Sequence, residues 1–99
     1  MDKALQEGQD VTVVTLGTHG GEVIKGAVLD CSVPLLQMRT TIRVVRETPV
    51  KVEGNDVLMV GEVCGCEREG EEYRIRVRLS EMLKSLSALA SSLQAQQFR

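Results

Sequence analysis

The side chains that could do chemistry begin with Asp30 and Ser32, which end an apolar stretch in the sequence VLDCSVPL, residues 28–35. Pro34 follows them closely. Two interpretations are open, a ligand-recognition motif or a polar turn between two strands. Polar side chains at a strand end are common, so the place of this segment in the fold has to decide between them.

Two groups of arginines could bind an anion through their guanidinium groups. The sequence RTTIR (39–43) supplies Arg39 and Arg43 as candidate anion contacts, with Arg46 three residues further on. The alternative is an exposed strand end and loop. The second group is Arg74, Arg76 and Arg78 in YRIRVRL (73–79). We interpret it as a solvated outer face that is balanced by nearby acids, namely Glu67, Glu69, Glu71 and Glu72.

No motif for catalysis or metal binding is recognisable. Cys64 and Cys66 lie two apart, but a zinc site usually needs a second pair or a nearby histidine, and the one histidine, His19, is far away in sequence. The chain has no nucleophile elbow, no P-loop and no G-x-G-x-x-G motif. We therefore expect no enzyme activity, no catalytic residue, no metal and no cofactor.

Composition narrows the class of protein further. Ninety-nine residues with 42% hydrophobic residues suit one small folded domain. A net charge of −2 and two aromatic residues disfavour binding to DNA or RNA. No apolar run is long enough to span a membrane, the first ten residues do not resemble a signal peptide, and three cysteines fit a reducing compartment. We expect a cytoplasmic protein.

The pattern of apolar residues predicts six strands followed by one helix. The strands are expected at residues 10–16, 22–30, 35–40, 48–53, 57–67 and 73–79. In the last of these, Tyr73, Ile75, Val77 and Leu79 should face inward. Ser80 is a suitable N-cap, and the apolar steps through Met82 and Leu86 predict an amphipathic helix at about 80–95. The expected fold is mainly β, a single domain with an antiparallel barrel of six or seven strands over about 10–79 and a C-terminal helix.

The order of these elements resembles the PilZ domain family. The matching features are the strand ending in VLDCS (28–32), the apolar strand LLQM (35–38), the segment TPVKVE (48–53), and the stretch GEVCGCEREGEEYRIRVRL (61–79) before a terminal helix. The opening LQEGQDVTVVTLG is also similar to the barrel that accompanies PilZ domains in flagellar-brake proteins. Both resemblances imply a small antiparallel barrel. The PilZ resemblance also implies a role in bacterial cyclic di-GMP signalling and motility.

The resemblance assigns ligand contacts only in part. Family members bind cyclic di-GMP through an Arg-x-x-x-Arg motif ahead of the barrel and an Asp/Asn-x-Ser-x-x-Gly motif at an early strand end. Asp30 and Ser32 match the second motif, but Leu35 stands in place of its glycine. No arginine precedes Asp30, and RTTIR has the right spacing but follows the Asp-x-Ser strand. Most of the charge-assisted binding to a dianionic ligand is therefore missing.

Three functional hypotheses follow. The first is a non-enzymatic PilZ-like regulatory module that acts by protein–protein contact, with nucleotide binding impaired. The second is a genuine cyclic di-GMP receptor that uses Asp30 and Ser32 with arginines from elsewhere, such as Arg39 and Arg43. The third is an unrelated small-barrel adaptor. The C-terminal helix is expected to dock on the barrel, and a homodimer through its leucines is the alternative.

Overall fold

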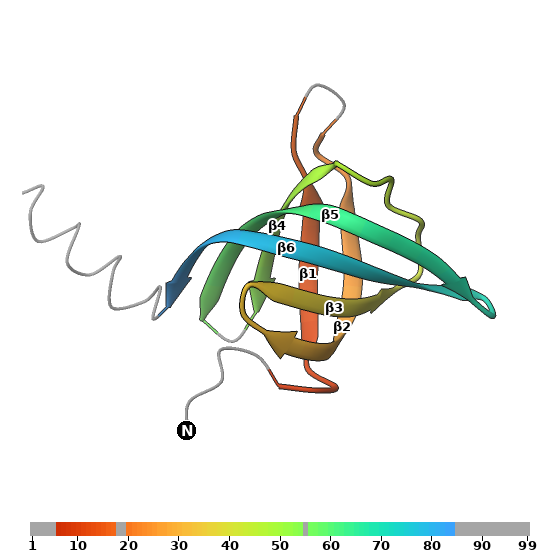
Figure 1. The fold of residues 1–99 in the computed structure, drawn as a ribbon, viewed down its shortest axis with the longest axis horizontal. Helices are drawn as coiled ribbons and strands as arrows, with labels where there is room; N and C mark the ends of the chain where they lie inside the picture. The colour runs from red at the N-terminus through yellow and green to blue at the C-terminus, as the bar shows by residue number, and fades with distance from the viewer. Residues whose placement is uncertain (1–5, 18–19, 55, 85–99) are drawn as a thin grey trace, which may run out of the picture.

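The chain forms a closed antiparallel β-barrel in the computed structural model, which describes residues 6–17, 20–54 and 56–84 (Figure 1). The strands are β1 (Asp10–Thr15), β2 (Val23–Ser32), β3 (Leu35–Thr40), β4 (Pro49–Gly54), β5 (Val57–Glu69) and β6 (Glu72–Lys84). Around the barrel they follow the order β1-β2-β3-β6-β5-β4, and β4 pairs with β1 to close it. The predicted mainly-β antiparallel barrel of six or seven strands is confirmed, and the number of strands is six.

The barrel interior is aliphatic, because alternate residues of each strand face it. In β6, Ile75, Val77 and Leu79 are buried as predicted, while Tyr73 is half-buried. The core consists of Val11, Val13, Ile24, Val28, Leu36, Met38, Val44, Val50, Val52, Val57, Met59, Val63, Ile75, Val77 and Leu79. Val44 is the one member from outside the described strands, and it anchors the connection between β3 and β4 to the core.

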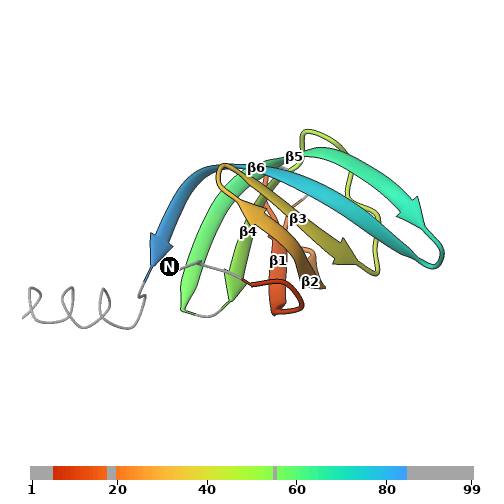
Figure 2. The same ribbon diagram turned by 60° about the horizontal axis from the view of Figure 1, so that its bottom comes forward.

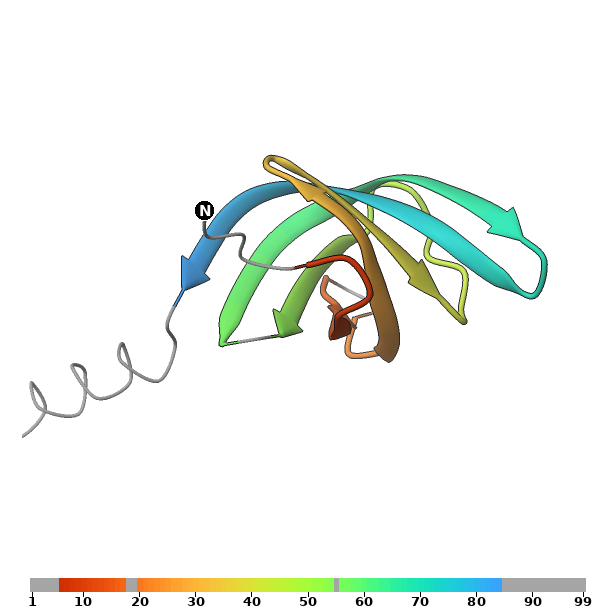
Figure 3. The same ribbon diagram turned by 90° about the horizontal axis from the view of Figure 1, so that it is seen from below.

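The longest elements are β5 and β6, a hairpin of two 13-residue strands that arches across the barrel (Figures 2 and 3). Its turn is at Gly70 and Glu71, where Gly70 adopts a left-handed φ of 66°. Neighbouring strands cover only part of its length, since β4 pairs with 57–62 and β3 pairs with 73–78. The half near the turn therefore extends past β4.

The prediction that a helix starts at Ser80 was wrong, because β6 continues to Lys84 and pairs with β5 as far as Val57. The barrel thus runs past residue 79. A register shift between Val60 and Gly61 leaves Ser80 as an extra residue, a β-bulge. No helix occurs among the described residues, and the predicted helical segment 85–95 lies outside them. The described residues contain no helix of the length and apolar character needed to span a membrane.

The bulge at Ser80 is held by a side-chain contact, since its hydroxyl Oγ donates to the carbonyl oxygen of Val60 at 3.1 Å. Replacing Ser80 by alanine should lower the free energy of unfolding by about 0.5–1 kcal/mol, the usual net value of one hydrogen bond. Chemical denaturation measures the change. The control is Ser32→Ala, because the Ser32 Oγ donates to the exposed Asp30 side chain, a hydrogen bond that should matter less. Equal losses in the two variants would contradict this role of Ser80.

Candidate functional site

Asp30 and Ser32 lie on the outer face at the end of β2. A register shift between Val28 and Asp30 places Asp30 opposite Gln37 and Ser32 opposite Leu35 of β3. Cys31, between them, packs against the core, and both polar side chains are exposed. The hydroxyl of Ser32 donates to Asp30 Oδ2 at 2.9 Å. Each therefore satisfies part of the other's hydrogen-bonding capacity.

The turn after Ser32 is compact and tied to β6. Val33 and Pro34 form it, with a cis peptide bond between them, and the Pro34 carbonyl oxygen accepts a hydrogen bond from the Leu79 N–H at 2.7 Å. Leu35 is the first residue of β3, paired with Ser32 on one side and Arg78 on the other. The position that a glycine occupies in the PilZ motif is thus a half-buried strand residue beside Ser32.

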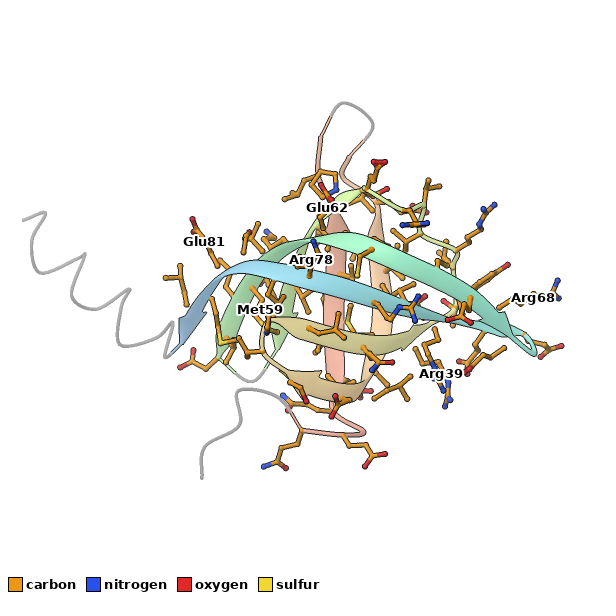
Figure 4. The ribbon with its side chains drawn as sticks, viewed as in Figure 1. Arg39, Met59, Glu62, Arg68, Arg78 and Glu81 are labelled. Atoms are coloured by element: carbon orange, nitrogen blue, oxygen red, sulfur yellow. The ribbon has the colours of Figure 1, made fainter. Side chains whose placement is uncertain are left out.

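Arg39 is part of a network of ion pairs on the outer face. Its guanidinium lies 3.7 Å from both Glu69 and Glu72. Glu69 also pairs with Arg74 at 3.1 Å, and Glu67 pairs with Arg76 at 3.4 Å. Figure 4 shows Arg39 on the same side of the molecule as Arg68, toward the β5–β6 turn, and Arg78 in the middle of the hairpin.

This network confirms the interpretation of Arg74 and Arg76 as part of an acid-balanced face. The pairs differ from the prediction in two respects, since neither Glu71 nor Arg78 forms an ion pair among the described residues. In each pair the arginine side chain is about 40% exposed or more. Such exposed pairs contribute about 0.2–1 kcal/mol each. They nevertheless mean that a ligand would have to compete with carboxylates for these guanidinium groups.

Arg43 lies at the opposite end of the β2–β3 pair from Asp30. Thr40, the last residue of β3, is opposite Gly26, and Arg43 comes after it in the connection to β4. The four residues predicted as ligand contacts are therefore not brought together. Asp30 and Ser32 are at one strand end, Arg39 is within the ion-pair network, and Arg43 is beyond the other strand end.

Arg43 instead lines a pocket of about 500 Å³ at one end of the barrel. The pocket, which we call the end pocket, is formed by the last residue of β1 and the two residues after it (15–17), by Glu22 and by the segment 43–49. Arg46 contributes to it as well. The sequence does not indicate that the apolar residues Leu16 and Val45 line a pocket, because strand periodicity does not show which loops meet at the end of a barrel. The only signal was the sequence RVVRE, two valines between arginines outside any predicted strand.

Two smaller hollows lie on the outside of β1 and β2. One, of about 400 Å³, extends over Val11 and Thr12 between Gly26 and Gly54. The other, of about 170 Å³, lies between Asp10 and Arg39. Their charged side chains have both signs, and one of them, Glu53, pairs with Lys51 at 3.1 Å. They offer no set of like charges for a ligand.

The cysteines do not form a metal site in the described part of the chain. A register shift between Val63 and Gly65 makes Cys64 a bulge residue, whereas Cys66 packs against the core. Within the described ranges, no three histidine, cysteine or acidic side chains gather where they could hold a metal ion.

In comparisons with known proteins, the chain matches no family model, no curated protein and no solved structure.

Proposed function

We propose that this chain is a non-enzymatic regulatory module of the PilZ type that acts by contact with another protein and has lost efficient cyclic di-GMP binding. The closed six-stranded antiparallel barrel supports the proposal, since the PilZ resemblance implies a barrel of this kind. The observation that carries it is the separation of the four residues that would bind the nucleotide.

The physical reason is electrostatic. A dianionic nucleotide needs guanidinium groups that converge on its phosphates. Arg39 would have to leave Glu69 and Glu72 to reach a phosphate. Arg43 lies beyond the far end of β3 from Asp30. Asp30 and Ser32 remain as an exposed, mutually hydrogen-bonded pair, which supplies no positive charge.

Isothermal titration of the full chain with cyclic di-GMP tests the proposal. We expect no binding in the micromolar range or tighter. Micromolar or tighter binding would contradict the proposal and favour the receptor hypothesis. In that case Asp30→Ala and Arg43→Ala should each weaken binding. Unchanged affinity in both variants would reject that arrangement of the site too.

A further inference from the structure

The end pocket has walls that are fixed by the fold. Val44 is 3% exposed and anchors the segment 43–49 in the core. Backbone hydrogen bonds join this segment to its neighbours, from Leu16 N–H to the Pro49 carbonyl at 2.9 Å and from Glu47 N–H to the Val63 carbonyl at 2.7 Å. Opposite them, the Glu22 N–H donates to Thr15 Oγ1 at 3.0 Å. A partner would therefore meet a largely preformed site, which lowers the entropy lost on binding.

Arg43 and Arg46 differ from the arginines of the outer face. Arg39, Arg74 and Arg76 are each paired with at least one glutamate. Within the described ranges, no carboxylate lies within ion-pair distance of Arg43 or Arg46, although both border the pocket. Their five-donor guanidinium groups match the geometry of a carboxylate, and here they need not give up an existing ion pair to bind one.

Apart from Arg43 and Arg46, the pocket lining consists of apolar residues, two threonines and two glutamates. Val45 is 62% exposed and Leu16 37% exposed, so each presents aliphatic surface to a partner. Glu22 and Glu47 offset the charges of Arg43 and Arg46, so the formal charge of the lining is zero. A neutral lining disfavours a polyphosphate. It suits a peptide, which offers N–H donors as well as carboxylates. Peptides with acidic and aliphatic side chains have this chemistry.

The turn at the pocket edge is strained. Thr48 N–H donates to the Val45 carbonyl at 3.2 Å, which closes a turn with Arg46 and Glu47 at its centre. Glu47 has a φ of 72°, in the left-handed region that favours glycine. A side chain there costs about 1–2 kcal/mol, and such residues are concentrated at binding sites. Glu47, which follows Arg46 in the sequence, is itself one of the residues that line the pocket.

We propose that the end pocket docks a short acidic segment of a partner protein, with its carboxylates on Arg43 and Arg46 and an aliphatic side chain against Leu16 and Val45. This inference rests on the proposed function and names the surface and the partner chemistry for it. Ion pairs with Arg43 and Arg46 would set specificity, and burial of the aliphatic side chain would add affinity.

Fluorescently labelled synthetic peptides in which glutamate alternates with leucine and valine are the probe, and binding to the full chain is followed by anisotropy. Arg43→Glu and Arg46→Glu should each weaken binding about tenfold, the effect of losing one charged hydrogen bond. The matched control is Arg78→Glu, an exposed arginine that lies outside the pocket and forms no ion pair with a described residue. It should leave affinity unchanged. Amide chemical shifts at 15–17 and 43–48 should change on binding.

A charge swap makes the test specific. Peptides with lysine in place of glutamate should bind the double variant Arg43→Glu, Arg46→Glu more tightly than they bind the parent. The inference is overturned if no acidic peptide binds, or if Arg43→Glu and Arg78→Glu weaken binding equally. Peptide binding that maps elsewhere overturns this site but leaves the protein-contact proposal standing. Cyclic di-GMP binding by a chain that binds no peptide contradicts both.

Discussion

Replacing Gly61 by alanine should lower the free energy of unfolding by about 3 kcal/mol, the upper part of the range for forcing an atom into a packed core. Gly61 is buried in β5, opposite Leu79 of β6. A Cβ atom at this position would press on the carbonyl oxygen of Arg78 and lie 2.9 Å from Val77 Cγ1. Both groups belong to β6, so the strands would have to separate where the long hairpin is bulged. The shift of the denaturation midpoint measures the effect.

Gly65→Ala is the matched control, because Gly65 is also buried in β5 and also lies at a register shift. The three atoms nearest to a Cβ added there all belong to the flexible Arg76 side chain, with Nη2 at 2.5 Å. That side chain is 43% exposed and can move, at the cost of its ion pair with Glu67. The expected loss is below about 1 kcal/mol, the value of an exposed ion pair. Equal losses in the two variants would mean that the Arg78 carbonyl does not constrain Gly61.

The strands could be predicted from the sequence because period-two alternation is a local property. β3 has the predicted bounds, and β1, β2, β4 and β5 end within two residues of them. In the segment 73–79 every second residue is apolar, and the structure buries that side. A closed barrel buries every second residue of a strand, so those residues have to be apolar and the pattern is visible in the sequence.

The end of β6 was misread because a β-bulge changes the period. Leu79 and Met82 both pack toward the core, three residues apart, since Ser80 is an extra residue in the pairing with β5. A step of three is also the spacing of a helix. Leu86 then continues a helix-like pattern in the sequence. Only the partner strand shows that the step at Ser80 is a bulge.

The site could not be predicted as an arrangement, since it depends on register between strands that are distant in sequence. Arg39 meets Glu69 and Glu72 because β3 lies beside β6. The spacing of RTTIR suggests two equivalent arginines, but Arg39 is on a strand among acids and Arg43 is in a loop. Arg39 and Arg43 have different surroundings because β3 ends at Thr40, between them.

Replacing Leu36 by alanine should cost about 3 kcal/mol of the free energy of unfolding, within the range measured for buried leucines. Leu36 is fully buried and lies between Cys31 of β2 and Val77 of β6. Its truncation leaves a cavity in the middle of the barrel, where the closed sheet limits collapse of the surrounding strands. Thermal or urea denaturation, followed by far-ultraviolet circular dichroism, measures the loss.

The adjacent residue supplies the control and makes the experiment a test of register. Leu35 is half-buried on the outer face, beside Ser32 and Arg78, so Leu35→Ala should cost less than about 1 kcal/mol of apolar burial. A slip of one residue in β3 would exchange the two faces of that strand. The reverse ranking, with Leu35→Ala the more damaging, would therefore contradict the register that places Leu35 beside the outward-facing Ser32. The position of Arg39 on the outer face depends on that same register, so the Leu35 and Leu36 pair tests part of the geometric basis for the proposal that nucleotide binding is lost.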